Sequence, residues 1–320
     1  MTSPDRIGEA TAGAETGARL MLIALCCVWG CTWPIMRIAL SEVPPFTMRT
    51  TSTLVGGVML FVLCYLMRRD LRIRGAKGWA HVCVAGILNV ASFSVFSTFA
   101  QLGAATSRVA ILAYTMPIWA MILSWIFLGE RPAGMQRISI ALCAGGLAVL
   151  IYPLTTAGIP LGIILALATG ISWAAGTVYL KWARIDADPM AIAVWQVAIS
   201  FFVIAACMLI FEGGPDFHAA HSAGVIATLL SGLLGTGIAY GLWFSIIQRL
   251  PAMTASLGVL GSPVIGVVAS ILILGERPTA ADYVGFALIL AASACVLFSR
   301  DPTALSSPGD GVESNKGVTV

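Results

Sequence analysis

The hydrophobic residues of this chain form long, nearly uninterrupted runs, without the alternation with polar residues that marks a half-buried strand or helix. A helix needs about 20 apolar residues to cross a bilayer, and the runs reach that length. The longest polar connections between them are residues 68–77 and 212–221. The pattern predicts ten spans, at residues 19–40, 45–67, 78–100, 104–128, 134–153, 160–182, 189–211, 222–247, 252–274 and 280–299.

The composition agrees with a protein that is surrounded by lipid. Hydrophobic residues make up 58% of the 320 residues and charged residues only 10%, whereas a soluble domain carries about 25% charge. The fold class is therefore an all-α polytopic membrane protein. The polar segments 1–18 and 301–320 are predicted to be disordered cytoplasmic tails. No basic patch interleaved with aromatic residues indicates nucleic-acid binding.

One stretch of the sequence occurs twice, 146 residues apart. Residues 114–132 read YTMPIWAMILSWIFLGERP, and residues 260–278 read LGSPVIGVVASILILGERP. Each copy carries a mid-span proline, Pro117 or Pro263. Because proline removes one helical hydrogen bond and clashes with the preceding turn, we expect a bend at both positions. The glycine that follows each apolar run predicts a sharp helix end.

The repeated stretch indicates that the two halves of the chain are related. The first repeat is predicted at residues 19–153 and the second at residues 160–299, each with five spans. Five is an odd number, so the second repeat enters the membrane from the opposite side. Inverted repeats of this kind occur in many secondary transporters.

The sequence resembles the drug/metabolite transporter superfamily, in its ten-span form with two EamA-type repeats. The resemblance rests on Trp29-Gly30, on the segment from Pro45 to Arg49, and on the two Pro…Gly-Glu-Arg motifs. It implies a transporter, and members of the superfamily move amino acids, other small metabolites, drugs or nucleotide sugars, with the EamA type mostly associated with export. We expect an exporter of amino acids or similar small amphipathic metabolites in the bacterial inner membrane. The second repeat departs from the pattern, because Ala193 stands where the first repeat has Arg49.

The basic residues predict how the chain is oriented. If both termini are cytoplasmic, fourteen of the eighteen lysines and arginines lie on the cytoplasmic side and three on the outer side. Short cytoplasmic loops of membrane proteins carry such an excess. Arg49 is the exception, because it lies within the second span. Two roles are open for it: packing against a helix end, or a place on the substrate pathway.

Acidic residues are absent from the middle of every predicted span. Proton-driven carriers commonly use an intramembrane Asp, Glu or His as the proton relay, and the three histidines lie at span ends or in a loop. Facilitated diffusion or substrate exchange by alternating access is therefore the favoured mechanism. A proton-coupled drug/metabolite antiporter is the alternative.

Aromatic and polar residues within the spans are candidates for a substrate cavity, because ligand sites combine apolar walls with a few hydrogen-bonding groups. The alternative for each of them is a place in the bundle core or in an interfacial belt. The predicted substrate-binding residues are Trp29, Trp33, Asn89, Ser92, Phe93, Tyr114, Trp173, Thr177, Tyr240, Trp243 and Ser256.

The repeated stretch supplies the candidate gating residues, which are Pro117, Pro263, Glu130 and Glu276. We expect each proline to act as a hinge. A carboxylate beside the first turn of the following helix meets free N–H groups, so each glutamate is expected to cap that helix or to form an ion pair at a gate. A direct role in transport is the second possibility for the glutamates.

Other functions fit the sequence less well. An intramembrane enzyme would need a nucleophile, a base or a metal at membrane depth, and the spans contain no such arrangement, so neither catalysis nor a cofactor is predicted. A receptor or scaffold would not need a duplicated core that opens to both sides. Pairs of small residues permit close helix packing and predict a monomer or a weak homodimer. These pairs are Ala141 with Gly145, Ala287 with Ala291, and Gly237 with Gly241.

Overall fold

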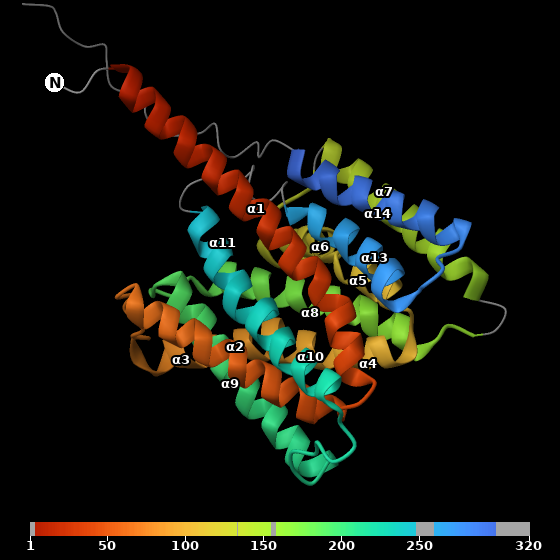
Figure 1. Ribbon diagram of the computed structural model, residues 1–320. Helices are drawn as coiled ribbons and strands as arrows, with labels where there is room; N and C mark the ends of the chain where they lie inside the picture. The colour runs from red at the N-terminus through yellow and green to blue at the C-terminus, as the bar shows by residue number, and fades with distance from the viewer. Residues whose placement is uncertain (1–3, 133, 155–157, 248–258, 299–320) are drawn as a thin grey trace, which may run out of the picture.

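The computed structural model describes residues 4–132, 134–154, 158–247 and 259–298, and every element in these ranges is a helix (Figure 1). In chain order the elements are α1 (Pro4–Leu40), α2 (Pro45–Leu66), α3 (Gly75–Ala85), η1 (Gly86–Ala91), α4 (Ser92–Gly103), α5 (Thr106–Ala113), α6 (Met116–Leu128), α7 (Met135–Ile151), η2 (Tyr152–Leu154), α8 (Leu161–Ala183), α9 (Pro189–Phe211), α10 (Ser222–Gly232), η3 (Leu233–Ile238), α11 (Ala239–Ile247), α13 (Gly261–Leu274) and α14 (Ala280–Phe298).

Eight helical segments of the described chain are long and apolar enough to cross a bilayer, and two shorter apolar helices, Gly261–Leu274 and Ala280–Cys295, follow them. An all-helical membrane protein is thereby confirmed, whereas the number of ten spans stays a prediction. The first candidate span is Arg19–Leu40, but α1 itself begins at Pro4, where the sequence predicts a disordered tail. The predicted tail at residues 301–320 lies outside the described residues.

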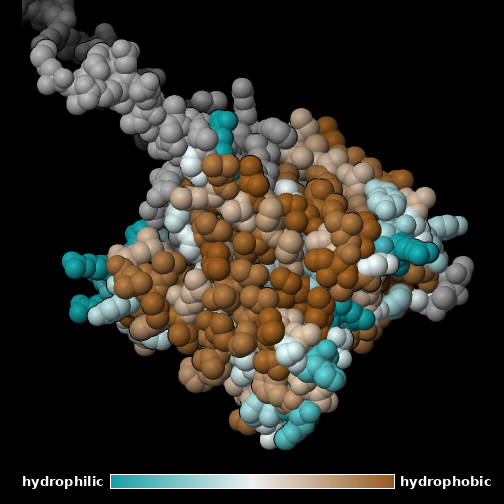
Figure 2. Space-filling view, in the orientation of Figure 1, coloured by the Kyte–Doolittle hydropathy of each residue, from teal (hydrophilic) through white to brown (hydrophobic). Residues whose placement is uncertain are grey.

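The outer surface of the helical bundle is apolar. Large side chains such as Ile210, Leu272 and Phe127 are 70–77% exposed. In Figure 2 hydrophobic residues cover the centre of the visible face, and hydrophilic residues gather at its margins. Soluble monomers rarely expose apolar patches larger than a few hundred Å², so this surface is suited to contact with lipid chains.

The two halves of the chain interlock through close helix crossings. At Gly232 in α10, an added Cβ would lie 2.1 Å from the carbonyl oxygen of Ser52 in α2. At Gly162 in α8, it would lie 2.4 Å from the backbone of Gly103. Side chains cannot fit at either crossing, so glycine permits the backbones of the two halves to touch.

The helices α7 and α14 lie side by side (Figure 1), but two of the expected small-residue pairs do not make this contact. Ala141, Ala287 and Ala291 are exposed, and an added Cβ at Gly145 would meet nothing within 4 Å. The contact is instead made by Gly146, which faces Gly285, Leu288 and Ile289. The packing prediction was therefore one residue out of register on α7.

The third pair of small residues does pack within the bundle. An added Cβ at Gly237 would lie 2.5 Å from the Met59 sulfur, and one at Gly241 would lie 2.8 Å from Leu63. Both contacts join the second half of the chain to α2.

Both halves interrupt their helices at corresponding places. The π-helical turns η1 and η3 begin at Gly86 and Leu233, which are 147 residues apart. A glycine with positive φ ends α6 and α13 alike, Gly129 at 73° and Gly275 at 67°. A residue with a Cβ would be strained in this left-handed conformation, so the predicted sharp helix ends are confirmed.

The repeated prolines act differently from the expectation of a bend within one continuous helix. α5 ends at Ala113, and α6 starts afresh at Met116, with Pro117 in its first turn. Pro263 likewise lies in the first turn of α13. The first N–H groups of a helix have no intrahelical partner, so a proline there removes no hydrogen bond. Each proline therefore starts a helix and does not kink one.

Candidate functional site

A cavity of about 170 Å³ lies between the two halves of the chain. This is smaller than the 300–1,000 Å³ of a drug-sized pocket, so it suits a small solute. Its lining residues from the first half are Trp29, Thr32, Trp33, Met36, Arg49, Val90, Phe93, Ser94, Ser97, Ala113, Tyr114 and Met116, and those from the second half are Trp173, Ser231, Gly235, Thr236, Tyr240 and Val259.

Irregular backbone from both halves borders this cavity. Val90 belongs to η1, and Gly235 and Thr236 belong to η3. Tyr114 occupies the break between α5 and α6. π-helical turns are often found at functional sites, and non-helical backbone at membrane depth is tolerated where protein buries it or where it lines a cavity.

Aromatic rings form much of the cavity wall. The Trp29 indole Nε1 donates to the Gly235 carbonyl oxygen over 3.2 Å, which joins α1 to the π-helical turn η3. Phe93 and Trp173 pack edge to face, with ring centroids 5.2 Å apart. Both contacts connect the first half of the chain to the second, so they fix the width of the cavity.

The structure brings together six of the predicted substrate-binding residues around the cavity, and their role stays a prediction. These are Trp29, Trp33, Phe93, Tyr114, Trp173 and Tyr240.

The other predicted binding residues lie elsewhere. Asn89 is buried in η1 against Gly176 of α8, and Thr177 is exposed. Trp243 packs behind the cavity wall, with its ring centroid 6.2 Å from that of Trp29. Ser92 is partly buried and does not line the cavity. Ser256 lies outside the described residues.

Arg49 reaches the cavity from the second turn of α2. Its Nε donates to the Thr98 hydroxyl at 2.5 Å and its Nη2 to the Ser97 hydroxyl at 2.7 Å. The Met36 sulfur lies 2.6 Å from the same Nη2. All three acceptors are neutral, so they orient the guanidinium without balancing its charge.

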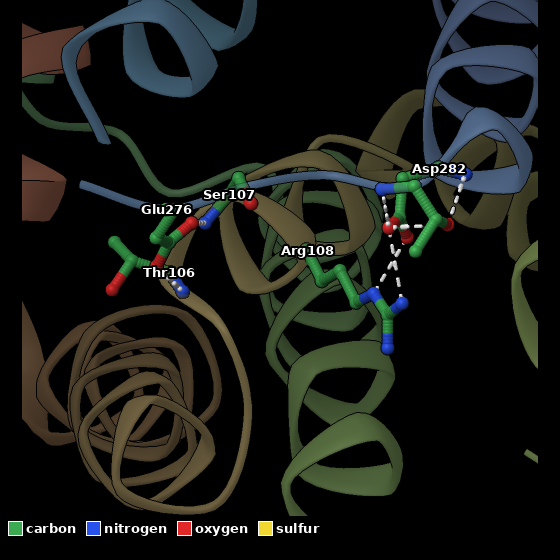
Figure 3. Close-up of polar contacts among 6 residues, drawn as sticks. Thr106, Ser107, Arg108, Glu276 and Asp282 are labelled. Atoms are coloured by element: carbon green, nitrogen blue, oxygen red, sulfur yellow. Dashed lines mark hydrogen bonds and ion pairs between the residues drawn. The ribbon is translucent and has the colours of Figure 1, made fainter. Parts of the chain in front are cut away.

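At one end of the bundle, carboxylates of one half cap helix starts of the other half. We call this end the carboxylate end. Glu276 accepts hydrogen bonds from the backbone N–H groups of Thr106 (2.6 Å) and Ser107 (2.9 Å), which open α5 (Figure 3). The sequence predicts capping of the following helix, α14, so the capped helix is a different one. Anionic groups at a helix start are favoured by its free N–H groups and its dipole.

Beside Glu276, an ion pair joins the same two halves (Figure 3). Arg108 donates from Nε and Nη2 to the two carboxylate oxygens of Asp282, at 2.6 and 3.0 Å. The Asp282 side chain is only 4% exposed, and it also accepts from the backbone N–H and the hydroxyl of Thr279. Thr279 and Asp282 thus form a capping box at the start of α14. The bidentate geometry makes this a strong contact.

Two further glutamates complete the carboxylate end. Glu212 accepts from the N–H groups of Phe46 and Thr47 at the start of α2, at 2.8 and 2.7 Å. Glu42 accepts from the N–H groups of His221 and Gly224 at the start of α10, at 2.9 and 3.0 Å. Each of these glutamates crosses between the halves, so three helix starts hold this end together.

The opposite end, which we call the basic end, comprises residues 68–74, 129–132, 134 and 184–188. Ion pairs are among its contacts between the halves. Glu130 pairs with Lys181 at 2.7 Å, with both side chains about half exposed. Arg74 pairs with Asp186 at 2.9 Å, with both side chains more than three-quarters exposed. Exposed pairs contribute only about 0–1 kcal/mol, so these two pairs hold this end weakly.

The basic end also has better-shielded contacts between the halves. Arg69 pairs with Asp188 at 3.5 Å, with side chains 31% and 21% exposed, and the Trp195 indole Nε1 donates to the Leu71 carbonyl oxygen at 2.8 Å.

Sequence reasoning did not find Glu42, Glu212 and Asp282, nor the hydroxyls that hold Arg49. Each of the three carboxylates stands at a span end, which is a weak signal for a capping role. The groups that Glu42 and Glu212 cap lie 165 to 182 residues away from them in the sequence. Only the folded chain brings such distant groups together.

Comparison with known proteins covers nearly the whole chain. The sequence profile of the EamA-like transporter family matches residues 16–152 and 160–298. The uncharacterized transporter YvbV of Bacillus subtilis is 28% identical over 297 residues, which cover 89% of this chain and 93% of that protein. Protein PA1977 of Pseudomonas aeruginosa is 30% identical, over 74% of this chain and 80% of its own length.

Two further similarities extend over most of the chain. A protein of Escherichia coli described as a probable amino-acid metabolite efflux pump is 23% identical, over 86% of this chain and 92% of its own length. A solved crystal structure matches with a TM-score of 0.61 at 22% identity, over 88% of this chain and 96% of that chain. This structural likeness concerns the fold alone.

Proposed function

Because this chain belongs to the EamA-like transporter family, we propose that it exports small amphipathic metabolites by alternating access, as a facilitator or an exchanger. One observation carries the proposal: the cavity lies between the two repeats, and helix interruptions of both repeats border it. Transporters built from repeats bind substrate near the membrane midplane at such an interface, on interrupted helices. Uptake of labelled metabolites by sealed proteoliposomes, compared with empty liposomes, tests it.

We propose that the chain spans the membrane ten times, with the two five-span repeats inverted. The basic end then faces the cytoplasm, because short loops rich in lysine and arginine stay on that side. Both termini would be cytoplasmic, and the carboxylate end would face outward from the bacterial inner membrane. The similarity to YedA, an inner membrane transporter of Escherichia coli, supports the location.

This orientation predicts which cysteine replacements a membrane-impermeant maleimide reaches in intact cells. In a background without the native cysteines, His218→Cys at the carboxylate end should be labelled. Arg137→Cys, at the start of α7 beside the basic end, should be labelled only after the membrane is permeabilised. Both side chains are exposed, so reagent access depends on the side of the membrane. The opposite labelling pattern would reject the orientation.

We propose that the conformation described here is closed at the carboxylate end. Three cross-repeat caps and the Arg108–Asp282 ion pair join the halves there. At the basic end, the Glu130–Lys181 and Arg74–Asp186 pairs are exposed and would separate more readily than the more deeply buried Arg108–Asp282 pair. Alternating access requires the two ends to open in turn, so the caps would form the outer gate. Glu130 and Glu276 would serve opposite gates.

Transport should follow the substrate gradient and depend little on an imposed pH gradient. Among the cavity-lining residues of the described chain there is no Asp, Glu or His that could relay a proton. The measurement is uptake by proteoliposomes with and without a pH gradient of one unit. A proton-coupled antiporter would instead accumulate substrate when the pH gradient alone is imposed, and that result would replace the facilitator mechanism. An ionophore that abolishes the gradient is the control.

A receptor or scaffold is the other class of function considered. It would bind a ligand at the cavity without moving it across the membrane, so it would show binding and no uptake. We propose neither a catalytic activity nor a cofactor. We propose that the chain is a monomer or a weak homodimer, and light scattering of the purified protein measures its mass.

A further inference from the structure

We propose that the cavity binds a small amphipathic organic anion, and that Arg49 receives the carboxylate of this anion. The inference rests on the proposed transport function and narrows its substrate class. It departs from amino acids, which carry an ammonium group as well as a carboxylate. The cavity would therefore favour an acid that has an apolar or aromatic body and no positive charge.

The guanidinium of Arg49 lies at the cavity with donor capacity to spare. Arginine has five N–H donors, and the contacts to Thr98, Ser97 and Met36 engage Nε and Nη2. Within the described chain no hydrogen bond from Nη1 is found. Nη1 and its two protons belong to the planar fork that binds a carboxylate with two parallel hydrogen bonds.

The charge of Arg49 has no counterpart in the described part of the molecule. The ion pairs found there involve other basic residues, and every contact of Arg49 is to a neutral acceptor. Charged groups at membrane depth are costly, and they are usually paired or mark a substrate pathway. An anionic substrate would supply the missing charge.

A second hydrogen-bond donor lies where α10 crosses α2, the helix that carries Arg49. Ser231 of α10 lines the cavity and is only 4% exposed, and its hydroxyl has no hydrogen-bond partner among the described residues. The next residue, Gly232, touches Ser52, which lies one helical turn after Arg49 on α2. A buried hydroxyl without a partner is unfavourable, and a carboxylate oxygen would satisfy it.

The rest of the cavity suits the body of such an acid. Trp29, Trp33, Phe93 and Trp173 present apolar rings, and the described lining residues include no carboxylate that could pair with an ammonium group. The second repeat has Ala193 at the position of Arg49. Among the described lining residues Arg49 is the one basic side chain, and we expect the cavity to bind one carboxylate.

Four probes with the same phenyl group separate the charge requirement from the shape requirement. They are 3-phenylpropionate (an anion), 3-phenylpropanamide (neutral), phenylalanine (a zwitterion) and phenethylamine (a cation). Binding to purified protein in lipid nanodiscs is measured by calorimetry. We expect the anion to bind roughly ten- to hundredfold more tightly than the amide, as a charged hydrogen-bonded pair requires. The zwitterion should bind more weakly than the anion.

Variants assign the preference to Arg49. Arg49→Met should reduce the affinity for the anion at least tenfold and leave that for the amide unchanged, whereas Arg49→Lys should retain part of the preference. Ser231→Ala should weaken anion binding by a smaller factor. Arg137→Met removes the charge of an exposed side chain that does not line the cavity, and it serves as the control for net charge. A thermal unfolding scan establishes that each variant is folded.

The outcomes distinguish the two proposals. Equal binding of anion and amide, tighter binding of phenylalanine than of the anion, or an Arg49→Met variant that keeps the anion preference would each overturn the anion site. If proteoliposomes transport the amide or the cation but not the anion, the transporter proposal stands and the anion site fails. If the anion binds through Arg49 but no probe enters proteoliposomes, the anion site stands and the transport function fails.

Discussion

Replacing Gly232 with alanine is expected to destabilise the folded protein by about 3 kcal/mol, at the upper end of overpacking effects. The added Cβ would meet the Ser52 carbonyl oxygen at 2.1 Å and the Ser52 carbonyl carbon at 2.8 Å. These are backbone atoms, so no side-chain rotation can relieve the clash. Helices α2 and α10 would have to move apart, and with them the two repeats. The measurement is the unfolding temperature in detergent, followed by circular dichroism.

Gly145→Ala is the matched control for this substitution. Gly145 also lies within a membrane helix, but an added Cβ there meets nothing within 4 Å. Alanine favours a helix by about 1 kcal/mol over glycine, so this variant should be as stable as the wild type or slightly more stable. If both variants unfold at the same temperature, close contact at the α2–α10 crossing does not hold the repeats together.

Removal of the Glu276 carboxylate is expected to open the carboxylate end. Glu276→Ala leaves the N–H groups of Thr106 and Ser107 without their acceptor, and a lost cap costs about 0.5–2 kcal/mol. A change of 1.4 kcal/mol shifts a two-state equilibrium tenfold. Spin labels at Leu102 and Tyr283, both about half exposed and in different repeats, should therefore report a larger population at long distance. The rate of uptake by proteoliposomes should change together with this long-distance population.

Two further variants make this test specific. Glu276→Gln keeps one acceptor oxygen without the charge, so it should give an intermediate distance distribution. Asp216→Asn removes a charge at the same end, where Asp216 accepts from the N–H of His218, two residues away, and caps no helix of the other repeat. It should leave the distances unchanged. If Glu276→Ala behaves as Asp216→Asn does, the cap stabilises α5 locally and takes no part in a gate.

The contrast between Glu276 and Glu130 illustrates the limit of sequence reasoning. Both stand in the same Gly-Glu-Arg-Pro motif after an apolar helix. One caps the start of α5, and the other forms an exposed ion pair with Lys181. The motif fixes the local helix end through its glycine, but the partner of the carboxylate comes from the other repeat. Sequence spacing within one repeat carries no information about that partner.

The sequence alone determined the membrane class, the location of the apolar helices and the existence of two related repeats. These properties follow from local composition, because the bilayer sets the length of a span and glycine sets the helix ends. The sequence also identified six aromatic residues that line the cavity, because large rings within spans are easily recognised.

The tertiary structure alone decided which polar groups meet. Asn89 and Thr177 have the right chemistry and spacing for a cavity, yet one is buried in a π-helical turn and the other is exposed. Arg49 reaches the cavity because hydroxyls of α4, about 50 residues away, hold its guanidinium there. Gly176, which packs against Asn89, and Gly232, which packs against Ser52 on the helix of Arg49, permit these close helix crossings. Close packing selects one register among several that hydropathy leaves equivalent.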